Sequence, residues 1–302
     1  MTGVPAAIFA PGFFDSAPVA IATTVGAVVA IVSGTVGVFT VLRGQSFAGE
    51  ALGDMQTTGG SAAFLTGVGT LWVFSAVAVA AAGVMELIGI QRPRGRDLAT
   101  GIVLGAGLGL AALLLYFEAR FHNTTGATAT IVFGSPFAIA ASTIPLVVVL
   151  SVLALGLILA LFRPLLLSSI SPDVAAARGI PVRLVGALYL LALAIAVALA
   201  AFTIGTILST ALLVGPAATA LRLTRSPGRA VLAAGLIGVA AMGLGILMAY
   251  DSYDWPPVGH GWPVSFFVVT LIFAAYLLAG LRRRRPVGGA SPGPVASDPA
   301  AG

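Results

Sequence analysis

The sequence contains no cysteine and no lysine, and few of its 302 residues carry a charge. The absence of cysteine excludes disulfide bonds and thiolate metal sites. Only 8% of the residues are charged, 59% are hydrophobic, and the mean hydropathy is +1.08. An ordinary soluble domain has about a quarter of its residues charged. The composition therefore excludes a soluble globular fold.

Catalytic signatures are also missing from the chain. It has no Walker phosphate-binding loop and no zincin helix, and its two histidines, His122 and His260, fall in polar connections. The sequence therefore predicts no enzyme and no energy source of its own. Such a protein either dissipates an ion gradient or is driven by a partner.

Apolar runs of about 20 residues recur along most of the chain, which is the length of a helix that crosses the hydrocarbon core. They predict an all-α, polytopic membrane helical bundle. We expect about nine transmembrane helices, or eight if the weakly apolar second one is incomplete. Their predicted positions are about residues 19–42, 47–67, 70–90, 98–117, 138–161, 184–202 and 205–221, an eighth that ends near 250, and 264–281.

The arginines predict the orientation of this bundle. Every basic residue is an arginine, and fourteen of the 15 fall on one side of the nine predicted spans, with only Arg120 on the other. The positive-inside rule makes the arginine side cytoplasmic, and this placement argues against a nucleic-acid partner. Residues 1–18 are then an external segment without a basic signal-peptide region. Residues 19–281 then form the transmembrane domain, and residues 282–302 form a disordered cytoplasmic tail.

Two carboxylates interrupt the second predicted helix. Glu50 and Asp54 are four residues apart, so they share one helix face. An acid at bilayer depth costs about 2.5 to 3.5 kcal/mol on insertion scales and usually faces a pathway or a bundle interior. We interpret the pair as part of an ion path. In the alternative, both acids are solvated or paired with arginine near the cytoplasmic mouth, since Arg43 is close in sequence. Met55 is expected to serve in packing, and Glu86 to pair with an arginine such as Arg92 or Arg94.

Small residues and proline mark two further spans. Gly101, Gly105 and Gly109 form a stripe at helical spacing, which predicts close packing against another helix. Pro216 lies within a span rich in threonine, serine and glycine, and we expect it to kink that helix.

Two loops carry the remaining candidate residues. The cytoplasmic loop 164–183 contains Ser171, Pro172, Asp173, Arg178 and Gly179, a Ser-Pro-Asp start and a Gly-Ile-Pro stop that predict a short capped surface helix. The external loop 251–263 contains Asp251, Asp254 and His260, which have metal-ligand chemistry. We expect that loop to act as an outer gate or a docking surface rather than as a metal store.

The order of several short motifs resembles the permease subunit of bacterial manganese, zinc and iron ABC importers, the ABC-3 family. The resemblance extends from about residue 19 to residue 281, and the segment around Pro216 is its most specific part. The motifs are Leu42-Arg43-Gly44, Gly49-Glu50-Ala51-Leu52, Phe133-Gly134, Ile170-Ser171-Pro172-Asp173, Gly179-Ile180-Pro181 and Val214-Gly215-Pro216-Ala217-Ala218-Thr219-Ala220.

The resemblance implies a homodimeric permease in the bacterial inner membrane, with cytoplasmic ATP-binding subunits and an extracellular metal-binding lipoprotein as partners. It implies that the helix within 164–183 couples to the ATPase. It also implies no permanent cofactor, because the metal ion is the transported substrate.

The family motif in the second helix places a histidine four residues after the acid. Here the acid is Glu50, but the histidine position is Asp54. Two carboxylates form a harder, all-oxygen site, which favours Mn²⁺ or Fe²⁺ over Zn²⁺.

Two other functions stay open at this point. A permease for a metal chelate, such as haem, a siderophore or cobalamin, would have a wide, largely uncharged cavity, so the paired acids count against it. A proton-coupled secondary transporter would use Glu50, Asp54 and Glu86 as a relay and would need no ATPase.

Overall fold

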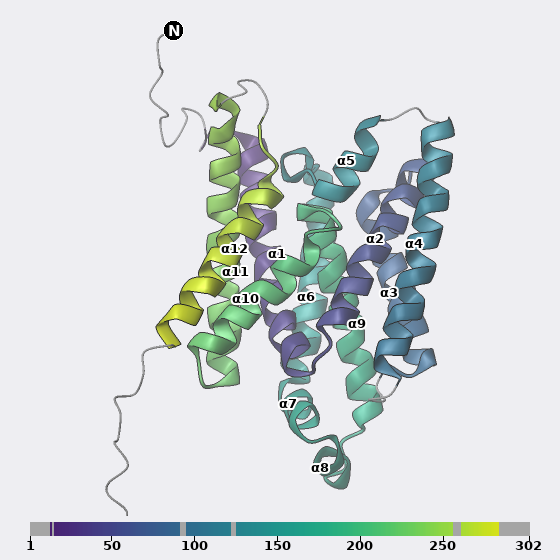
Figure 1. Cartoon of the computed structure of the whole chain (residues 1–302), viewed down its shortest axis with the longest axis vertical. Helices are drawn as coiled ribbons and strands as arrows, with labels where there is room; N and C mark the ends of the chain where they lie inside the picture. Colours follow the sequence, from purple (N-terminus) through teal and green to yellow (C-terminus); the bar gives the residue numbers. More distant parts are fainter. Residues whose placement is uncertain (1–12, 14, 91–94, 122–124, 256–260, 284–302) are drawn as a thin grey trace, which may run out of the picture.

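The computed structural model describes residues 13, 15–90, 95–121, 125–255 and 261–283, and these residues form helices, with no strand among them (Figure 1). The external segment 1–18, the tail 282–302 and His260 were predicted features that lie largely or wholly outside the described residues. Seven helices are long and apolar enough to cross a membrane, which confirms a multi-pass helical bundle. They are α1 (Ala17–Leu42), α3 (Thr70–Ile88), α4 (Arg96–Phe121), α6 (Ile144–Ala160, extended by a preceding 3₁₀ turn), α9 (Val182–Ile204), α11 (Pro227–Asp251) and α12 (Val264–Arg283).

Two further helices, α2 (Ser46–Thr66) and α10 (Ser209–Leu223), occupy the second and seventh predicted spans. Neither is among the seven long apolar helices of the described chain, because α2 is too polar and α10 has only 15 residues. The total of nine spans therefore stays a prediction.

Proline and glycine delimit several of these helices. Proline stands in the first turn of α1, α6 and α11, where the missing N–H is not needed by the helix. Gly67 ends α2 and Gly89 ends α3 in the left-handed conformation, with φ of 68° and 103°.

Three elements differ from the sequence-based expectation. The helix α5 (Thr125–Phe133) occupies part of the predicted polar connection, and α7 (Phe162–Ile170) extends the surface segment before α8 (Pro172–Ala177). The fifth span begins at Ile144, after two 3₁₀ turns, rather than near residue 138.

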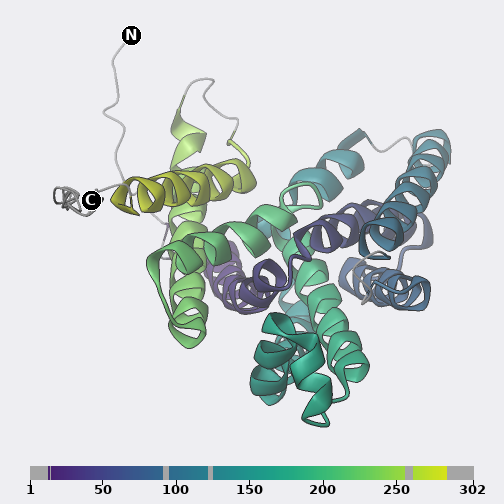
Figure 2. The same ribbon diagram turned by 60° about the horizontal axis from the view of Figure 1, so that its bottom comes forward.

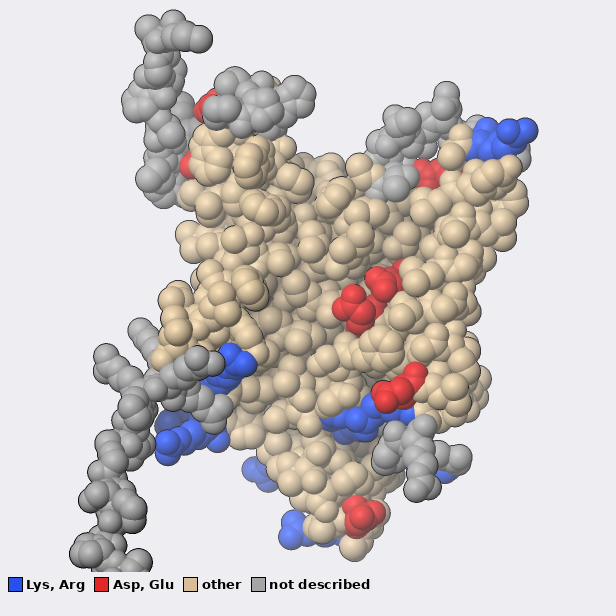
Figure 3. All heavy atoms as spheres, in the orientation of Figure 1, with Lys and Arg blue, Asp and Glu red and all other residues tan. Residues whose placement is uncertain are grey.

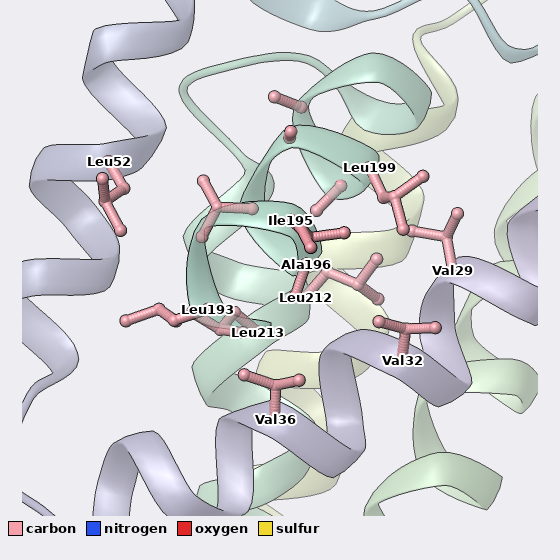
Figure 4. Packing of buried hydrophobic residues seen from close by; sticks show 14 of the residues in the cluster. Val29, Val32, Val36, Leu52, Leu193, Ile195, Ala196, Leu199, Leu212 and Leu213 are labelled. Atoms are coloured by element: carbon pink, nitrogen blue, oxygen red, sulfur yellow. The ribbon is translucent and has the colours of Figure 1, made fainter. Parts of the chain in front are cut away.

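The helices α1 and α9 form the centre of the bundle. About three quarters of each apolar segment is buried, 72% for α1 and 78% for α9, against 22% to 39% for the other five long helices. Valines of α1 pack against leucines of α9 and α10, and Leu52 of α2 reaches the same cluster (Figure 4). The helices α3, α4 and α6 leave much of their apolar surface exposed, as expected of surfaces that face lipid or another subunit.

Most of the described arginines gather at one end of the molecule, which we name the arginine-rich end. This end carries α7, α8 and the turn between α10 and α11, and Figure 3 shows it as the blue lower part. A separate blue patch lies at the opposite end of α4, whose last turn contains Arg120. The helix α1 begins at the opposite end and finishes near the arginine-rich end (Figure 1).

Candidate functional site

The helix α2 is enclosed by other helices on most of its circumference. Gly49 and Gly53 face α10, where a Cβ on either glycine would lie 2.8 Å from a side-chain atom of Leu213 or Ser209, respectively. Met55 packs directly on Gly107 of α4, which confirms its expected packing role. The Thr58 hydroxyl donates a 2.8 Å hydrogen bond to the carbonyl oxygen of Gly107.

Glu50 and Asp54 occupy the sector of α2 that lies between its α10 and α4 contacts. At 100° per residue, both acids project between the Gly49–Gly53 face and the Thr58–Met55 face. Both side chains are partly exposed, whereas Gly49, Gly53 and Thr58 are buried. The acids therefore line a gap in the helical wall rather than a helix contact.

This gap lies about halfway between the two ends of the molecule. Figure 3 shows an acidic patch over α2, surrounded by uncharged surface and separate from the arginines below it. Burial is the largest influence on the Asp54 carboxylate, and the like charge of Glu50 comes second. No arginine is among these influences on Asp54, and the alternative interpretation, in which both acids are solvated or paired with arginine near the cytoplasmic mouth, stays a prediction.

The acids alone do not complete a metal site. Within the described residues no cluster of three or more acidic or histidine side chains could hold a metal ion. Two carboxylates supply at most four oxygen atoms, whereas an octahedral Mn²⁺ site uses six ligands. Further oxygens must come from water, hydroxyl groups, main-chain carbonyls or a second protein chain.

Hydroxyl groups adjoin the acid pair on the side that lies farther from the arginine-rich end. The Thr57 hydroxyl donates a 3.1 Å hydrogen bond to the Thr206 hydroxyl, and the Ser209 hydroxyl donates to the Thr206 carbonyl oxygen at 2.8 Å. Thr206 and Ser209 are buried. Sequence reasoning did not assign these hydroxyls to the site, although the threonine- and serine-rich character of 205–221 was a signal for them.

A backbone contact fixes the linker that carries Thr206. Gly134 follows α5 and Gly205 follows α9, with φ of 72° and 90°, and a Cβ on Gly205 would overlap the carbonyl oxygen of Val132. The Thr206 amide also donates a 3.1 Å hydrogen bond to the Ile131 carbonyl. The α5 helix and the α9–α10 linker are thus joined through two glycines that no other residue replaces without strain.

The helix α5 covers α2 beyond the acids. Ile131 of α5 lies on Gly60, where a Cβ would come 2.7 Å from its side chain. Ser61, on the same face of α2 as the acids, is fully buried. The gap that exposes Glu50 and Asp54 therefore ends at α5, on the side that lies farther from the arginine-rich end.

Two of the three predicted outer-loop residues lie at and just beyond the end of α11. Asp251 is buried at the end of α11, Asp254 is exposed in the following 3₁₀ turn, and His260 lies outside the described residues. Asp254 lines a cavity of about 570 Å³ together with Tyr250, Tyr253 and Trp262.

The predicted surface helix within 164–183 forms at the arginine-rich end. It is α8, with Ser171 as its N-cap, Pro172 and Asp173 in the first turn, and Arg178 as its C-cap. Gly179 follows with φ of 77°, which explains the stop. Figure 2 shows α8 at the tip of a projection that α7 and the start of α9 support.

Arg43 and Glu86 interact near the same end. Burial lowers the pKa of Arg43, while Tyr189 and Glu86 raise it and Arg96 lowers it further. Glu86 thus has an electrostatic influence on Arg43, whereas its expected pairing with Arg92 or Arg94 stays a prediction, because these two arginines lie outside the described residues.

The expectation about the glycine stripe of α4 was wrong, and the expectation about Pro216 stays a prediction. The stripe of Gly101, Gly105 and Gly109 was expected to pack on another helix, but a Cβ at any of the three would meet nothing within 4 Å. Gly107 is the close-packed glycine of α4 instead. Pro216 is buried inside α10, which continues through it, and a kink there stays a prediction.

Known proteins are similar to this chain in sequence and in fold. The manganese transport system membrane protein MntC of Listeria innocua is 28% identical over 83% of this chain and 87% of its own length. MntC of Halalkalibacterium halodurans is 30% identical over 85% and 86%, respectively. The manganese import system permease protein ScaB of Streptococcus parasanguinis is 29% identical over 74% and 78%.

A solved structure, PsaBC from Streptococcus pneumoniae in complex with Fab, matches with a TM-score of 0.75 and 25% sequence identity, covering 89% of this chain and 92% of that one. The model of the ABC 3 transport family matches residues 17–279, which include the whole bundle from α1 to the last turns of α12. The chain is therefore a member of the ABC 3 transport family.

Proposed function

We propose that this chain is the membrane-spanning permease subunit of an ATP-driven importer for a divalent metal ion, with Mn²⁺ as the favoured substrate. Metal would pass from an external binding protein to the cytoplasm. The observation that carries the proposal is the position of the partly exposed Glu50 and Asp54 between the α10 and α4 contacts of α2, at mid-height of the bundle. The names of the relatives, which are manganese transport proteins, support the choice of metal.

The chemistry of the acid pair favours a hard cation. Carboxylate and hydroxyl oxygens suit Mn²⁺, while an imidazole would shift the site toward Zn²⁺. Fe²⁺ and Zn²⁺ are the other substrates that the proposal admits. Because the two carboxylates alone supply too few ligands, we propose that a second copy faces the same gap and that the permease works as a homodimer.

The two ends of the molecule would serve the two partners. The arginine-rich end is placed in the cytoplasm by the positive-inside rule, so the N-terminus is external and α8 meets the ATP-binding subunits. The loop around Asp254 and its cavity lies at the opposite end and would meet the external metal-binding lipoprotein.

Uptake of radioactive Mn²⁺ into cells that express the complete system tests the substrate path. Glu50→Gln and Asp54→Asn are expected to lower uptake at least tenfold while the amount of membrane-inserted protein stays normal. Asp97→Asn is the matched control, because Asp97 is an exposed acid in the first turn of α4. Normal uptake in both site variants would show that the metal path runs elsewhere.

The energy source requires a separate measurement. Uptake should depend on the ATP-binding subunit and should disappear when that subunit lacks hydrolysis activity. Uptake by this chain alone in a proton gradient would contradict the proposal and favour a secondary transporter.

A further inference from the structure

A three-residue turn, Arg43 to Gln45, joins the central helix α1 to the acid-bearing helix α2. The Gly44 amide donates to the Val41 carbonyl at 3.1 Å, and the Gln45 amide donates to the Thr40 carbonyl at 2.9 Å. Gly44 has φ of 63°, and Gln45 is 1% exposed. The turn is therefore held to the last turn of α1, and α2 begins directly after it.

The Arg43 side chain links this turn to two other helices. Its Nη1 atom donates a 3.2 Å hydrogen bond to the Ser168 hydroxyl of α7. Its guanidinium carbon lies 5.0 Å from the centre of the Tyr189 ring of α9, in cation–π geometry. The Tyr189 hydroxyl in turn donates a 2.9 Å hydrogen bond to Thr40 of α1.

A second contact on the same face of α1 joins α1 to α7. Phe39 precedes Arg43 by four residues, so both side chains lie on one face of the helix. The Phe39 ring meets the Phe162 ring of α7 edge to face, with 5.4 Å between ring centres. The last turn of α1 thus holds α7 at both ends, at Phe162 through an aromatic pair and at Ser168 through Arg43.

The helix α7 leads directly into α8. Only Ser171 separates them, and Leu165 of α7 and Ala175 of α8 are both fully buried. A displacement of α8 therefore moves α7, and Ser168 of α7 is bonded to the residue that begins the turn into α2.

We infer that Arg43 is the positioning residue that transmits the movement of α8 to α2, and so to Glu50 and Asp54. The inference rests on the proposed function, in which α8 receives the ATPase. Arginine suits this position because its planar guanidinium stacks on an aromatic ring while its N–H groups bond elsewhere, which lysine cannot do as well.

The complex of this permease with its ATP-binding subunit and binding protein, reconstituted in proteoliposomes, tests the inference. The quantity to measure is Mn²⁺ taken up per ATP hydrolysed. Arg43→Gln is expected to lower this ratio at least fivefold, while ATP hydrolysis stays within twofold of the wild type. Arg43→Lys is expected to give an intermediate ratio.

Two further variants separate coupling from folding. Ser168→Ala removes the acceptor on α7 and leaves Arg43 in place, so it is expected to lower the ratio at least twofold even if Arg43→Gln fails to assemble. Tyr189→Phe keeps the ring under Arg43 and loses only the bond to Thr40, so its ratio should stay within twofold of the wild type. The double variant Arg43→Gln with Ser168→Ala should have the same uptake ratio as Arg43→Gln alone, because both changes break the same contact between Arg43 and Ser168.

Three outcomes would overturn the inference. An unchanged ratio in both Arg43→Gln and Ser168→Ala would show that the link does not transmit movement. A parallel loss of uptake and hydrolysis in both would show that it only maintains the fold. A wild-type complex with no ATP-dependent uptake would overturn the proposed function as well, so the two failures are distinguishable.

Discussion

Gly53 of α2 lies directly against Ser209 at the start of α10, so close that a Cβ atom on the glycine would sit 2.8 Å from the serine Oγ. The same Cβ would be 3.3 Å from Oγ1 of Thr210. The acid pair of α2 and the hydroxyl-rich start of α10 are therefore neighbours only because residue 53 has no side chain.

Gly53→Val should separate these two helices. We expect it to destabilise the protein by about 1 to 3 kcal/mol, the usual cost of overpacking, and to lower Mn²⁺ uptake. Thermal unfolding of the purified protein in detergent measures the first effect. Gly101→Val is the matched control, because it makes the same change at a helical position where a Cβ meets nothing within 4 Å. Equal losses of stability in the two variants would contradict the packing argument.

Asp54→His should change the preferred metal. An imidazole beside Glu50 replaces one of the two carboxylates with a nitrogen ligand, which suits Zn²⁺ better than Mn²⁺. Competition between the two ions in an uptake assay measures the Mn²⁺/Zn²⁺ ratio, which we expect to fall at least threefold. An unaltered ratio would place metal selection outside this chain, most simply on the external binding protein.

Gly205→Ala should damage the contact between α5 and the α9–α10 linker. The φ of 90° at this position strains any residue that has a side chain, and the added Cβ would overlap the carbonyl oxygen of Val132. Gly179→Ala provides the control, since Gly179 has φ of 77° but nothing within 4 Å of a Cβ. We expect a loss of about 1 to 2 kcal/mol for Gly179→Ala from strain alone and a clearly larger loss for Gly205→Ala, both measured by thermal unfolding. A smaller loss for Gly205→Ala would show that the contact is not tight.

Val174→Glu should weaken docking of the ATP-binding subunit without unfolding the permease. Val174 is an exposed apolar residue of α8, 44% accessible, and α8 forms the tip of the projection in Figure 2. Co-purification of the ATP-binding subunit with the variant is expected to fall at least fivefold. Ser226→Glu adds the same charge in the exposed turn between α10 and α11, where the serine side chain makes no capping bond. Unchanged co-purification of Val174→Glu would place the ATPase contact elsewhere.

Hydropathy predicted most of the bundle because each long helix must satisfy its own backbone in lipid and so needs an uninterrupted apolar run. The helices α5 and α7 escaped prediction for a different reason. Each has nine residues, too few for a clear periodic pattern, and each is stabilised by distant partners such as Gly60 for α5 and Phe39 for α7. Such helices are specified by tertiary contacts, which a local pattern does not contain.

Only the charged residues of the candidate site were predictable from the sequence. Glu50 and Asp54 stand out because acids are rare inside apolar sequence. Thr206, by contrast, reaches Thr57 through the Gly134–Gly205 contact, which joins segments about seventy residues apart in sequence. The glycine stripe of α4 could not be interpreted from the sequence for a similar reason. A glycine allows another helix to approach closely, but the sequence does not say whether one does.

The low hydropathy of α2 has a consequence for how the protein is made. With two acids at about 2.5 to 3.5 kcal/mol each on insertion scales, α2 is a poor substrate for insertion on its own. Its neighbours in sequence, α1 and α3, are strongly apolar. We expect the translocon to release α2 into the bilayer together with these two helices, so that biogenesis begins with a three-helix unit.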